Sequence, residues 1–496
     1  MLLPLAVLFS ALLPADLVEQ SAKDAAPSGL LAGVSRVDIS PPIGIPQMNW
    51  GAQTHVESAA IDPAGMFATA LVLSDGKQKF AMVDIDALFS THLDSVRTRA
   101  AALTGIPAEH IRLAATHTHA GPFLTKEKGP VGYDLAKYSK SFDNYWDIVA
   151  DKITGAIVEA NSKLEPAHAG GSKGNGTINI NRRIRRNGTQ PPGVGRNPAG
   201  LVDRDLIVIR IDSAAGKPLA VLVNFQCHGT VMAWENKAIS PDWPGMMRRT
   251  VEDALPGARC LFFQGAAGNQ GPIEGFTGDL GVAHRLGMIL GHEAAALALQ
   301  TETVRRAPKF EGWVESTAFI ARQPWRVAGP RDGTLKFASV VTELPPRTYT
   351  PAEVDRMSTA VADAKMKASS ARAKGDKWEI HAAEARQRRF EDLLVKWKKP
   401  PASEPVRVRL QMLRIGEMAL VAMPGEPFAE IGQAIKKASP FPVTMFCGYS
   451  TGEGGEYMPV EPEYHHEGYE VDRTPYGTGA AEKLIEAAKA LFPSIR

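Results

Sequence analysis

Two apolar runs in this chain each lead to a histidine that is followed closely by a glycine. The run IRLAA leads into THTHAGP, which carries His117 and His119, and the run AVLVNFQ leads to His228. Side chains two residues apart on an extended strand point to the same face, so the first two imidazoles project together where their strand ends. Strands that end in histidines and then turn sharply are typical of ligands that converge at one edge of a sheet. The chain therefore has to fold around a sheet whose edge can hold a metal ion.

Short β-rich runs alternate with helical stretches from Leu31 onward. This pattern predicts a mixed α/β (α+β) fold, with a large mixed β-sheet core flanked by helices. The predicted strands cover residues 68–74, 79–85, 110–115, 206–211, 220–226, 260–263, 408–415 and 419–422. The predicted helices cover residues 144–163, 245–254, 282–299, 428–437 and 479–491. Because the candidate ligands are spread along the chain and have to meet, we expect residues 29–496 to form a single catalytic domain.

The charge balance and the cysteine content exclude several classes of function. Lys and Arg number 56 against 54 Asp and Glu, a net charge of +2, so we expect no nucleic acid partner. Cys227, Cys260 and Cys447 are too scattered for a disulfide framework or a thiolate zinc cluster. The expected partner is a small molecule, and any metal has to be bound by His, carboxylate or Tyr side chains.

Residues 1–28 have the composition of a signal peptide and leader. The apolar run MLLPLAVLFSALLPA is too short to span a bilayer, and small and charged residues follow it. No Lys or Arg precedes the run, so the positive end of the signal is weak, and an apolar tail that packs on the domain is the alternative. We expect a secreted or periplasmic protein.

The segment from Thr350 to Lys399 differs from the rest of the chain because it is dense in Ala, Lys, Arg and Glu. Its first residues, TPAE, form a capping box with proline at the first helical position, and the segment predicts two charged helices. Two interpretations are open. The insertion is either a flap or dimer arm beside the site, or a solvated helical excursion stabilised by charge pairs.

Glu426 is the carboxylate that could complete a metal site. It lies in MPGEP, between the apolar run ALVA and a predicted helix, where its side chain can reach the same sheet edge as the histidines. Zinc binds neutral imidazoles and carboxylate oxygens, and a catalytic zinc site keeps one position for water. The alternative is that Glu426 only stabilises the N-terminal end of the helix that follows.

Taken together, THTHAGP, NFQCHGT, PGE and a tyrosine-rich tail resemble the neutral/alkaline (non-lysosomal) ceramidase family. The opening AGVSRVDIS is similar to the family's first strand, so the resemblance covers the chain from about Leu31 to the end. Members of this family are zinc-dependent hydrolases that cleave the N-acyl amide bond of ceramide. The resemblance therefore implies an N-acylsphingosine amidohydrolase-like enzyme of sphingolipid metabolism, which uses one Zn²⁺ per chain and attacks with a metal-bound water.

The resemblance also implies which residues bind the metal. The four zinc ligands would be His117, His228, Glu426 and Tyr457. Tyr457 is chosen over Tyr449 because its spacing to the later tyrosines of the tail is similar to the family's pattern.

Three further residues would take part in catalysis by the same resemblance. His119 would face the substrate amide and pass a proton to the leaving amine, a role suited to a group that titrates near neutral pH. Arg182 would face the substrate, and Tyr469 would stabilise the oxyanion. Each of these residues also has an alternative role without chemistry. His119 could be a core histidine, Arg182 could belong to a solvated basic patch, and Tyr469 could be a packed tyrosine with a polar tip.

Two features depart from the family's pattern. The family carries a serine near the metal, in the stretch after the strand that here reads LFF. In this chain that stretch is QGAAGN, and Gly265 stands where the serine should be. A glycine supplies no hydroxyl, which puts ceramide itself in doubt as the substrate. We also expect no C-terminal immunoglobulin-like domain of the kind that many family members carry.

These departures leave other functions open. The first is a zinc amidase or esterase that acts on a smaller, non-ceramide substrate, and the second is a non-catalytic, zinc-stabilised binding protein whose metal is closed by four protein ligands. A third alternative is that the histidines never converge and are structural. The ligand types favour zinc over iron, cobalt or manganese without excluding them. Peripheral membrane contact and the oligomeric state stay open.

Overall fold

The central feature of the fold is an eight-stranded mixed sheet. The computed structural model describes residues 26–123, 138–184, 193–400, 404–452 and 454–496, so the predicted signal peptide lies largely outside the described residues. The strand order is β12–β10–β9–β6–β1–β3–β4–β5. Its strands are β1 (Leu30–Asp38), β3 (Phe67–Ser74), β4 (Lys79–Ile85), β5 (Ile111–Ala115), β6 (Glu165–Asn175), β9 (Asp205–Ser213), β10 (Pro218–Phe225) and β12 (Arg259–Gln264).

The sheet consists of two halves that meet closely. The halves β12–β10–β9–β6 and β1–β3–β4–β5 are joined by a short pairing of residues 30–32 with residues 165–167. Side chains connect them again, since the backbone N–H of Phe262 on β12 donates to Asp84 Oδ2 on β4 at 2.9 Å. Parallel pairs lie at both ends of the sheet, β4 with β5 and β10 with β12. The sheet therefore folds back so that the ends of β5 and β10 lie near each other.

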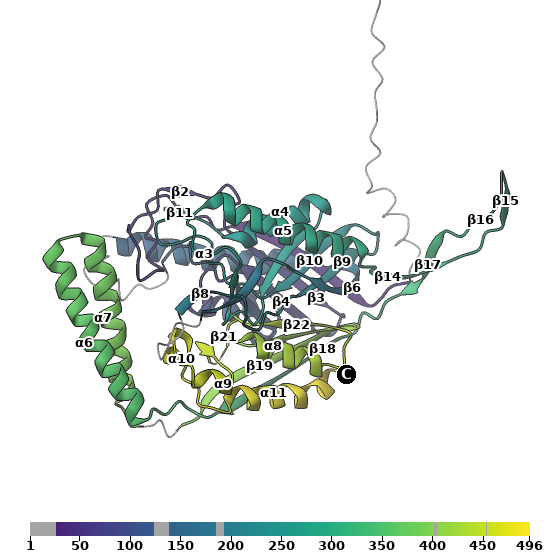
Figure 1. The fold of residues 1–496 in the computed structure, drawn as a ribbon. Coiled ribbons are helices and arrows are strands. Elements are labelled where there is room, and N and C mark those ends of the chain that lie inside the picture. The colour runs from purple at the N-terminus through teal and green to yellow at the C-terminus, as the bar shows by residue number, and fades with distance from the viewer. Residues whose placement is uncertain (1–25, 124–137, 185–192, 401–403, 453) are drawn as a thin grey trace, which may run out of the picture.

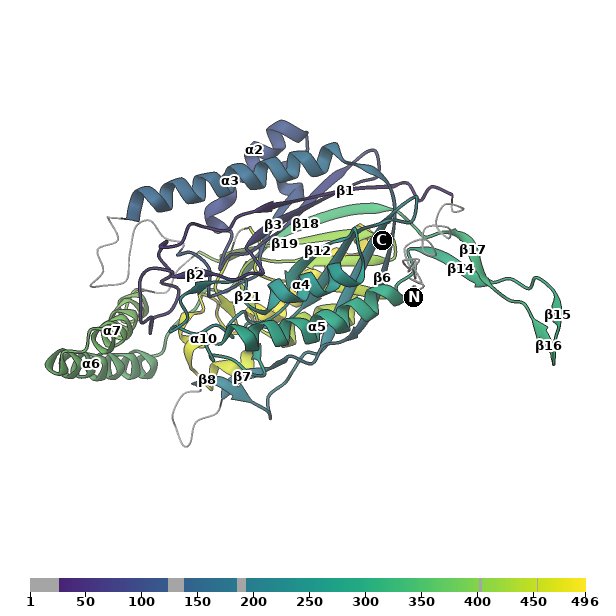
Figure 2. The same ribbon diagram turned by 90° about the horizontal axis from the view of Figure 1, so that it is seen from above.

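The side chains of each strand alternate between two apolar layers, as the period of two in a strand requires. On β3, Ala70 and Val72 belong to the core beneath the helices, whereas Leu71 and Leu73 pack toward the second sheet. Helices α2 and α3 cover one half of the large sheet and α4 and α5 the other half (Figures 1 and 2). These helices are α2 (Asp94–Thr104), α3 (Ser139–Ser162), α4 (Trp243–Ala254) and α5 (Leu280–Gln300).

A second, four-stranded sheet packs on the opposite face, and its outer side is covered by α8 and α11. The molecule therefore has four layers in the order helix, sheet, sheet, helix. The elements of this part are β18 (Leu335–Leu344), β19 (Val406–Ile415), β20 (Met418–Ala422), β22 (Val443–Cys447), α8 (Ala429–Ala438) and α11 (Ala480–Leu491).

Short elements gather where the strands end. They are β2 (Ala60–Ile61), β7 (Asn179–Ile184), β8 (Gly193–Asn197), β11 (Ala238–Ile239), β13 (Gln270–Pro272), β21 (Glu426–Pro427), β23 (Tyr457–Met458), α9 (Glu461–Tyr464) and α10 (Tyr469–Arg473). Three-residue pairings such as β13 with β7 hold the loops of the large sheet together.

Two excursions leave the body at opposite ends (Figures 1 and 2). One is the helical pair α6 (Pro351–Lys374) and α7 (Lys377–Trp397), which confirms the two predicted charged helices. Its capping box is present, since the Thr350 side chain accepts from Glu353 N–H and the Glu353 side chain accepts from Thr350 N–H. The other is an extended arm of β14 (Val304–Pro308), β15 (Trp313–Glu315), β16 (Phe319–Ala321) and β17 (Trp325–Pro330).

The mixed α/β fold is confirmed, and all eight predicted strands and five predicted helices are present with small shifts at their ends. The central strand β6 was not predicted because its sequence, EPAHAGGSKGN, reads as a loop. Its glycines are required by close packing on both faces. A Cβ at Gly170 would lie 2.1 Å from Glu302 O, and one at Gly171 would lie 2.7 Å from Met418 Cγ. Within the described residues, no helix is long and apolar enough to cross a membrane.

Candidate metal centre and active site

The two histidine-bearing segments lie side by side after β5 and β10. Thr118 and Gly229 form a parallel bridge, and the backbone N–H of His119 donates to Gly229 O at 3.1 Å. His117 has a positive φ of 64°, a conformation that is uncommon for a residue with a side chain. The local backbone thus turns His117 toward His228, and their ring centroids are 4.7 Å apart.

Glu426 reaches the same place from the second sheet. One of its carboxylate oxygens, Oε2, lies 3.1 Å from His228 Nε2 and 3.4 Å from His117 Nε2. All three side chains are at most 4% exposed. Three of the four predicted ligands therefore converge, although they come from loops that follow β5, β10 and β20.

The hydrogen bonds behind the two imidazoles fix their orientation. His117 Nδ1 lies 2.8 Å from Leu88 O, and His228 Nδ1 lies 2.7 Å from Ala267 O. A carbonyl only accepts, so each Nδ1 donates a proton, and in the neutral form of each ring Nε2 presents a lone pair to Glu426. Two imidazole lone pairs and a carboxylate oxygen that face one another without a proton between them fit a bound cation, and backbone partners of this kind are the usual support of metal-binding histidines.

The charge states of these groups agree with that arrangement. Burial, together with the nearby Arg182, lowers the pKa of His228 to about 3, so its imidazole is neutral at pH 7. Burial alone would raise the pKa of Glu426, but the interactions with His117 and His228 hold it well below its ordinary value. A neutral imidazole and an ionised carboxylate are the forms that bind Zn²⁺.

His119 lies at the edge of this cluster and faces the cavity. Its Nε2 is 3.4 Å from His117 Nε2, and the ligand atoms of His117, His119 and His228 all lie within 4.8 Å of one another. Its ring packs on Trp50 at a centroid distance of 4.7 Å, and its Nδ1 has no hydrogen-bond partner among the described residues. Burial and the two neighbouring histidines keep the pKa of His119 well below its ordinary value. The role of His119 as a substrate-facing base stays a prediction, and its position also suits a third imidazole ligand.

Two tyrosines lie beside the cluster. Tyr457 is the register partner of Glu426 in the parallel pair β21 and β23, so both side chains leave the pair on the same face. Tyr449, which was set aside from the sequence, has its ring 4.4 Å from that of His117, a positive φ of 54° and a buried hydroxyl that is hydrogen-bonded to Glu426. Burial, and then Glu426, raise the pKa of both phenols well above the ordinary value.

Arg182 is buried, and it is not part of a solvated patch. Its Nε donates to Glu470 Oε1 at 3.0 Å, and its guanidinium lies over the ring of Tyr457 at 5.4 Å. Arg183 is buried as well and pairs with Glu470 through its other oxygen at 2.6 Å. Arg185 and Arg186 lie outside the described residues. Tyr469 is half-buried, and its ring lies 5.6 Å from that of Tyr457.

The glycines of the QGAAGNQGP stretch face different surroundings. A Cβ at Gly265 would lie 2.5 Å from Gln226 Oε1, so a serine at this position would be directed at Gln226 and would require that side chain to shift. A Cβ at Gly271 would instead lie 3.4 Å from Arg182 Cβ, an ordinary contact at the border of the site. Gly271, on β13, is therefore the glycine of this stretch whose missing side chain faces the predicted catalytic residues.

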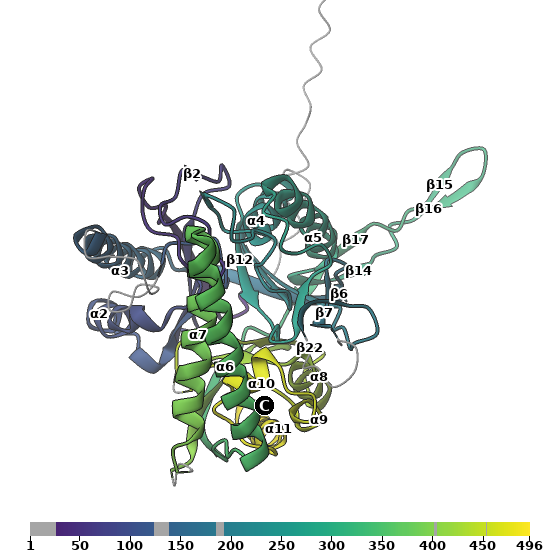
Figure 3. The ribbon, with the colours of Figure 1, turned by 60° about the vertical axis from the view of Figure 1, so that its left-hand side comes forward.

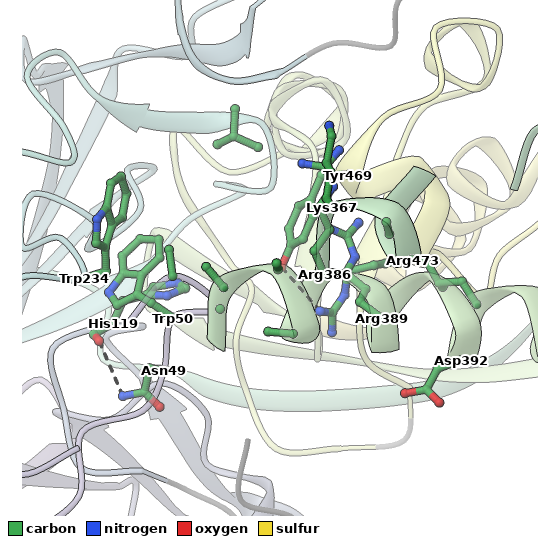
Figure 4. A pocket seen from close by; sticks show the side chains of 18 of the residues that line it. Asn49, Trp50, His119, Trp234, Lys367, Arg386, Arg389, Asp392, Tyr469 and Arg473 are labelled. Atoms are coloured by element: carbon green, nitrogen blue, oxygen red, sulfur yellow. Dashed lines mark hydrogen bonds between the residues drawn. The ribbon is translucent and has the colours of Figure 1, made fainter. Parts of the chain in front are cut away.

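A cavity of about 1250 Å³ opens above the cluster (Figure 4). Its lining includes His119, Arg182, Tyr457 and Tyr469, together with aromatic side chains from the loops after β1 and β10 and with one side of the pair α6 and α7. Figure 3 shows this helical pair crossing the side of the molecule in front of β12 and α10. The lining by α6 and α7 agrees with the interpretation of the insertion as a flap beside the site. Trp50 and Trp234 were not predicted, because neither lies in a recognisable motif.

Comparisons with known proteins agree with this geometry. Residues 30–276, which include His117, His228 and Arg182, match the family model described as neutral/alkaline non-lysosomal ceramidase, N-terminal. The chain belongs to the neutral/alkaline non-lysosomal ceramidase family.

Individual ceramidases are distant relatives. The chain is 24% identical to a neutral ceramidase of Pseudomonas aeruginosa over 489 residues, which cover 90% of this chain and 68% of the relative. It is 30% identical to neutral ceramidase A of Dictyostelium discoideum over 174 residues, which cover 34% of this chain and only 24% of that relative. The crystal structure of the Pseudomonas neutral ceramidase superposes with a TM-score of 0.61 at 20% identity, over 95% of this chain and 74% of the other, and this likeness concerns the fold.

Proposed function

We propose that this member of the ceramidase family is a zinc-dependent amidohydrolase that cleaves the N-acyl amide bond of ceramide or a related N-acyl lipid. The observation that carries the proposal is the convergence of His117, His228 and Glu426 on one buried point at the floor of a large cavity. Tyr457 would complete the ligand set. A zinc ion held by these residues supplies a Lewis acid and lowers the pKa of water.

The remaining residues of the site act on the substrate. His119 is neutral because burial lowers its pKa, so its nitrogen can accept a proton and return it to the nitrogen of the leaving amine. Trp50 fixes the His119 ring from one side. Tyr469, at the border of the cavity, can donate a hydrogen bond to the acyl oxygen as charge develops there.

Arg182 has a positioning part in this scheme. Its guanidinium is paired with Glu470 and lies over Tyr457, so it orients the phenol ring next to Glu426. Its buried charge also disfavours a proton on His228, which is one cause of the low pKa of that imidazole. This arrangement supports a role in keeping the site in its metal-binding form.

The proposal is tested with the purified full chain, N-acylsphingosine and a set of shorter N-acyl amides and esters. Wild-type protein loaded with zinc should release fatty acid, and both a chelator and His117→Ala should abolish release. His465→Ala removes an exposed histidine and is the matched control, which should leave release unchanged. If the zinc-loaded protein cleaves no amide and no ester, the proposed activity is wrong, and cleavage of the short compounds alone would point to the smaller substrate class.

A further inference from the structure

The cavity has two chemically different ends. At one end Trp50 lies 6.0 Å from Trp234 and 5.7 Å from Phe276 between ring centroids, which makes an apolar wall beside His119. At the other end basic side chains of α6, α7 and α10 surround Tyr469 (Figure 4). Of the predicted reacting groups, His119 lies at the aromatic end and Tyr469 at the basic end. A ligand that fills this cavity is therefore apolar at one end and polar at the other.

The basic end carries more positive charge than its surroundings neutralise. Six cations line it, Lys367, Lys374, Arg386, Arg389, Lys396 and Arg473, against three carboxylates, Glu379, Asp392 and Glu456. Two of them have acidic partners, since Lys374 lies 3.3 Å from Glu379 and Arg473 lies 3.0 Å from Glu456. In the part of the chain that the structure describes, no carboxylate lies within salt-bridge distance of Lys367, Arg386, Arg389 or Lys396.

Arg389 packs on the predicted catalytic residue Tyr469. Its guanidinium lies 4.3 Å from the centroid of the Tyr469 ring, and its Nε is buried without a hydrogen-bond partner among the described residues. Arg386, one helical turn earlier on α7, is exposed and lines the same cavity. Residues three apart on a helix lie on one face, so two guanidinium groups face the cavity together.

We propose that the substrate is an anionic N-acyl amphiphile, whose acyl chain lies on the aromatic wall and whose amine part carries a negatively charged group bound by Arg386, Arg389 and Lys396. The class includes amides of carboxylate-, sulfonate- or phosphate-bearing amines. Guanidinium groups bind such planar or tetrahedral anions through paired N–H donors. This inference rests on the proposed amidohydrolase function and narrows its substrate class from neutral ceramide to a charged relative.

The helical insertion forms part of the cavity wall. The cavity-facing side chains Ala364 and Ala371 of α6 are small and buried, which brings the two helices close to the opening while the arginines of α7 project into it. The insertion thus closes the polar end of the cavity. It is a substrate-binding wall, and the charged helices are not merely a solvated excursion.

The experiment compares two ligands that cannot be hydrolysed, 1-dodecyl-3-(2-sulfoethyl)urea and 1-dodecyl-3-(2-hydroxyethyl)urea, which differ only in the charge of the polar end. Binding to the full chain, as purified, is measured by calorimetry. We expect the sulfonate to bind at least about tenfold more tightly, the effect of roughly one charge-assisted hydrogen bond. This preference should weaken at high salt, because the exposed charges become screened. Inorganic sulfate alone should bind weakly, since it lacks the chain that contacts the aromatic wall.

Substitutions test which residues cause the tighter binding of the sulfonate. The double variant Arg386→Gln with Arg389→Gln should lose this preference, while Arg389→Lys should keep part of it. Arg388→Gln removes the same charge from the same helix outside the cavity and should keep all of it. If the double variant does not fold, the exposed Arg386→Gln alone should reduce the preference. Equal binding of the two ureas to wild-type protein, or a preference that survives the double variant, would overturn the inference. A preference without hydrolysis of any amide would contradict the proposed function and leave the anion site standing.

Discussion

Tyr457 and Glu426 are register partners on β23 and β21, a parallel pair of two-residue strands at the floor of the cavity. The pairing places a phenol and a carboxylate on the same face, although 30 residues lie between them in the chain, and it explains how a tail segment reaches histidines of the large sheet. Glu426 N–H also donates to Glu456 O at 2.9 Å, so the backbone of the tail holds the carboxylate in place.

The two tyrosines beside the cluster should respond differently to loss of their hydroxyls. Tyr457→Phe should lower the zinc affinity by at least about tenfold, because even an outer partner of a metal site contributes that much. Tyr449→Phe should leave the zinc affinity unchanged and lower the free energy of unfolding by about 1 kcal/mol, since it removes a buried hydroxyl that is hydrogen-bonded to Glu426. Competition with a zinc-binding dye and urea unfolding measure the two effects. The reverse ranking of zinc affinities would make Tyr449 the ligand.

The metal-free protein should lose stability as the pH falls. The pKa of His228 is lowered from 6.5 to about 3 by burial and by Arg182, so between these values the unfolded chain binds a proton that the folded chain does not. The free energy of unfolding should therefore decrease below about pH 6.5, with a slope of up to about 1.4 kcal/mol per pH unit from this histidine. The low pKa of Glu426 acts in the same direction at lower pH, because its contribution is present above the ordinary carboxyl pKa and is lost as the pH falls.

Urea unfolding in the presence of a chelator, at several pH values between about 7 and 5, measures this dependence. His228→Asn cannot take up the proton and should flatten the curve. The exposed His466→Asn is the matched control and should reproduce the wild-type slope. An unchanged slope in His228→Asn would show that this imidazole is not buried in its neutral form.

Serine should be accepted at one glycine of the QGAAGNQGP stretch and not at the other. Gly265→Ser should reduce the free energy of unfolding by about 1–3 kcal/mol, because its Cβ meets Gln226 Oε1 at 2.5 Å and the core has to shift. Gly271→Ser should change it by less, because the nearest atom lies at 3.4 Å. Thermal unfolding of both variants measures the difference. Equal decreases in the free energy of unfolding would contradict the packing described for this loop.

The leader should direct export. When the full chain is expressed in a bacterial host, we expect the protein in the periplasm or the medium, with a new N-terminus near residue 28. Mass spectrometry of the purified protein measures that terminus. A variant that lacks residues 2–28 should stay in the cytosol, and an uncleaved chain that starts at Met1 and remains in the cytosol would refute the signal.

Much of the fold and the metal cluster could be predicted because the information is local. Apolar runs of five to nine residues predicted the strands whose ends carry His117 and His228, and a capping box predicted the start of α6. Strand β6 was missed because its glycines are selected by contacts with both neighbouring layers, which no local pattern records. Tyr449 was set aside and the cavity-facing arginines of α7 were not singled out, because their importance comes from contacts with distant segments, Tyr449 with His117 and Arg389 with Tyr469.

The central claim is that His117, His228 and Glu426 bind one zinc ion per chain while His119 faces the substrate. Elemental analysis of the purified wild-type protein, His117→Ala, His119→Ala and the control His465→Ala tests it most directly. We predict one zinc per chain in wild type, in His119→Ala and in the control, and none in His117→Ala. Zinc that persists in His117→Ala, or a wild-type protein that binds no metal, would contradict the account.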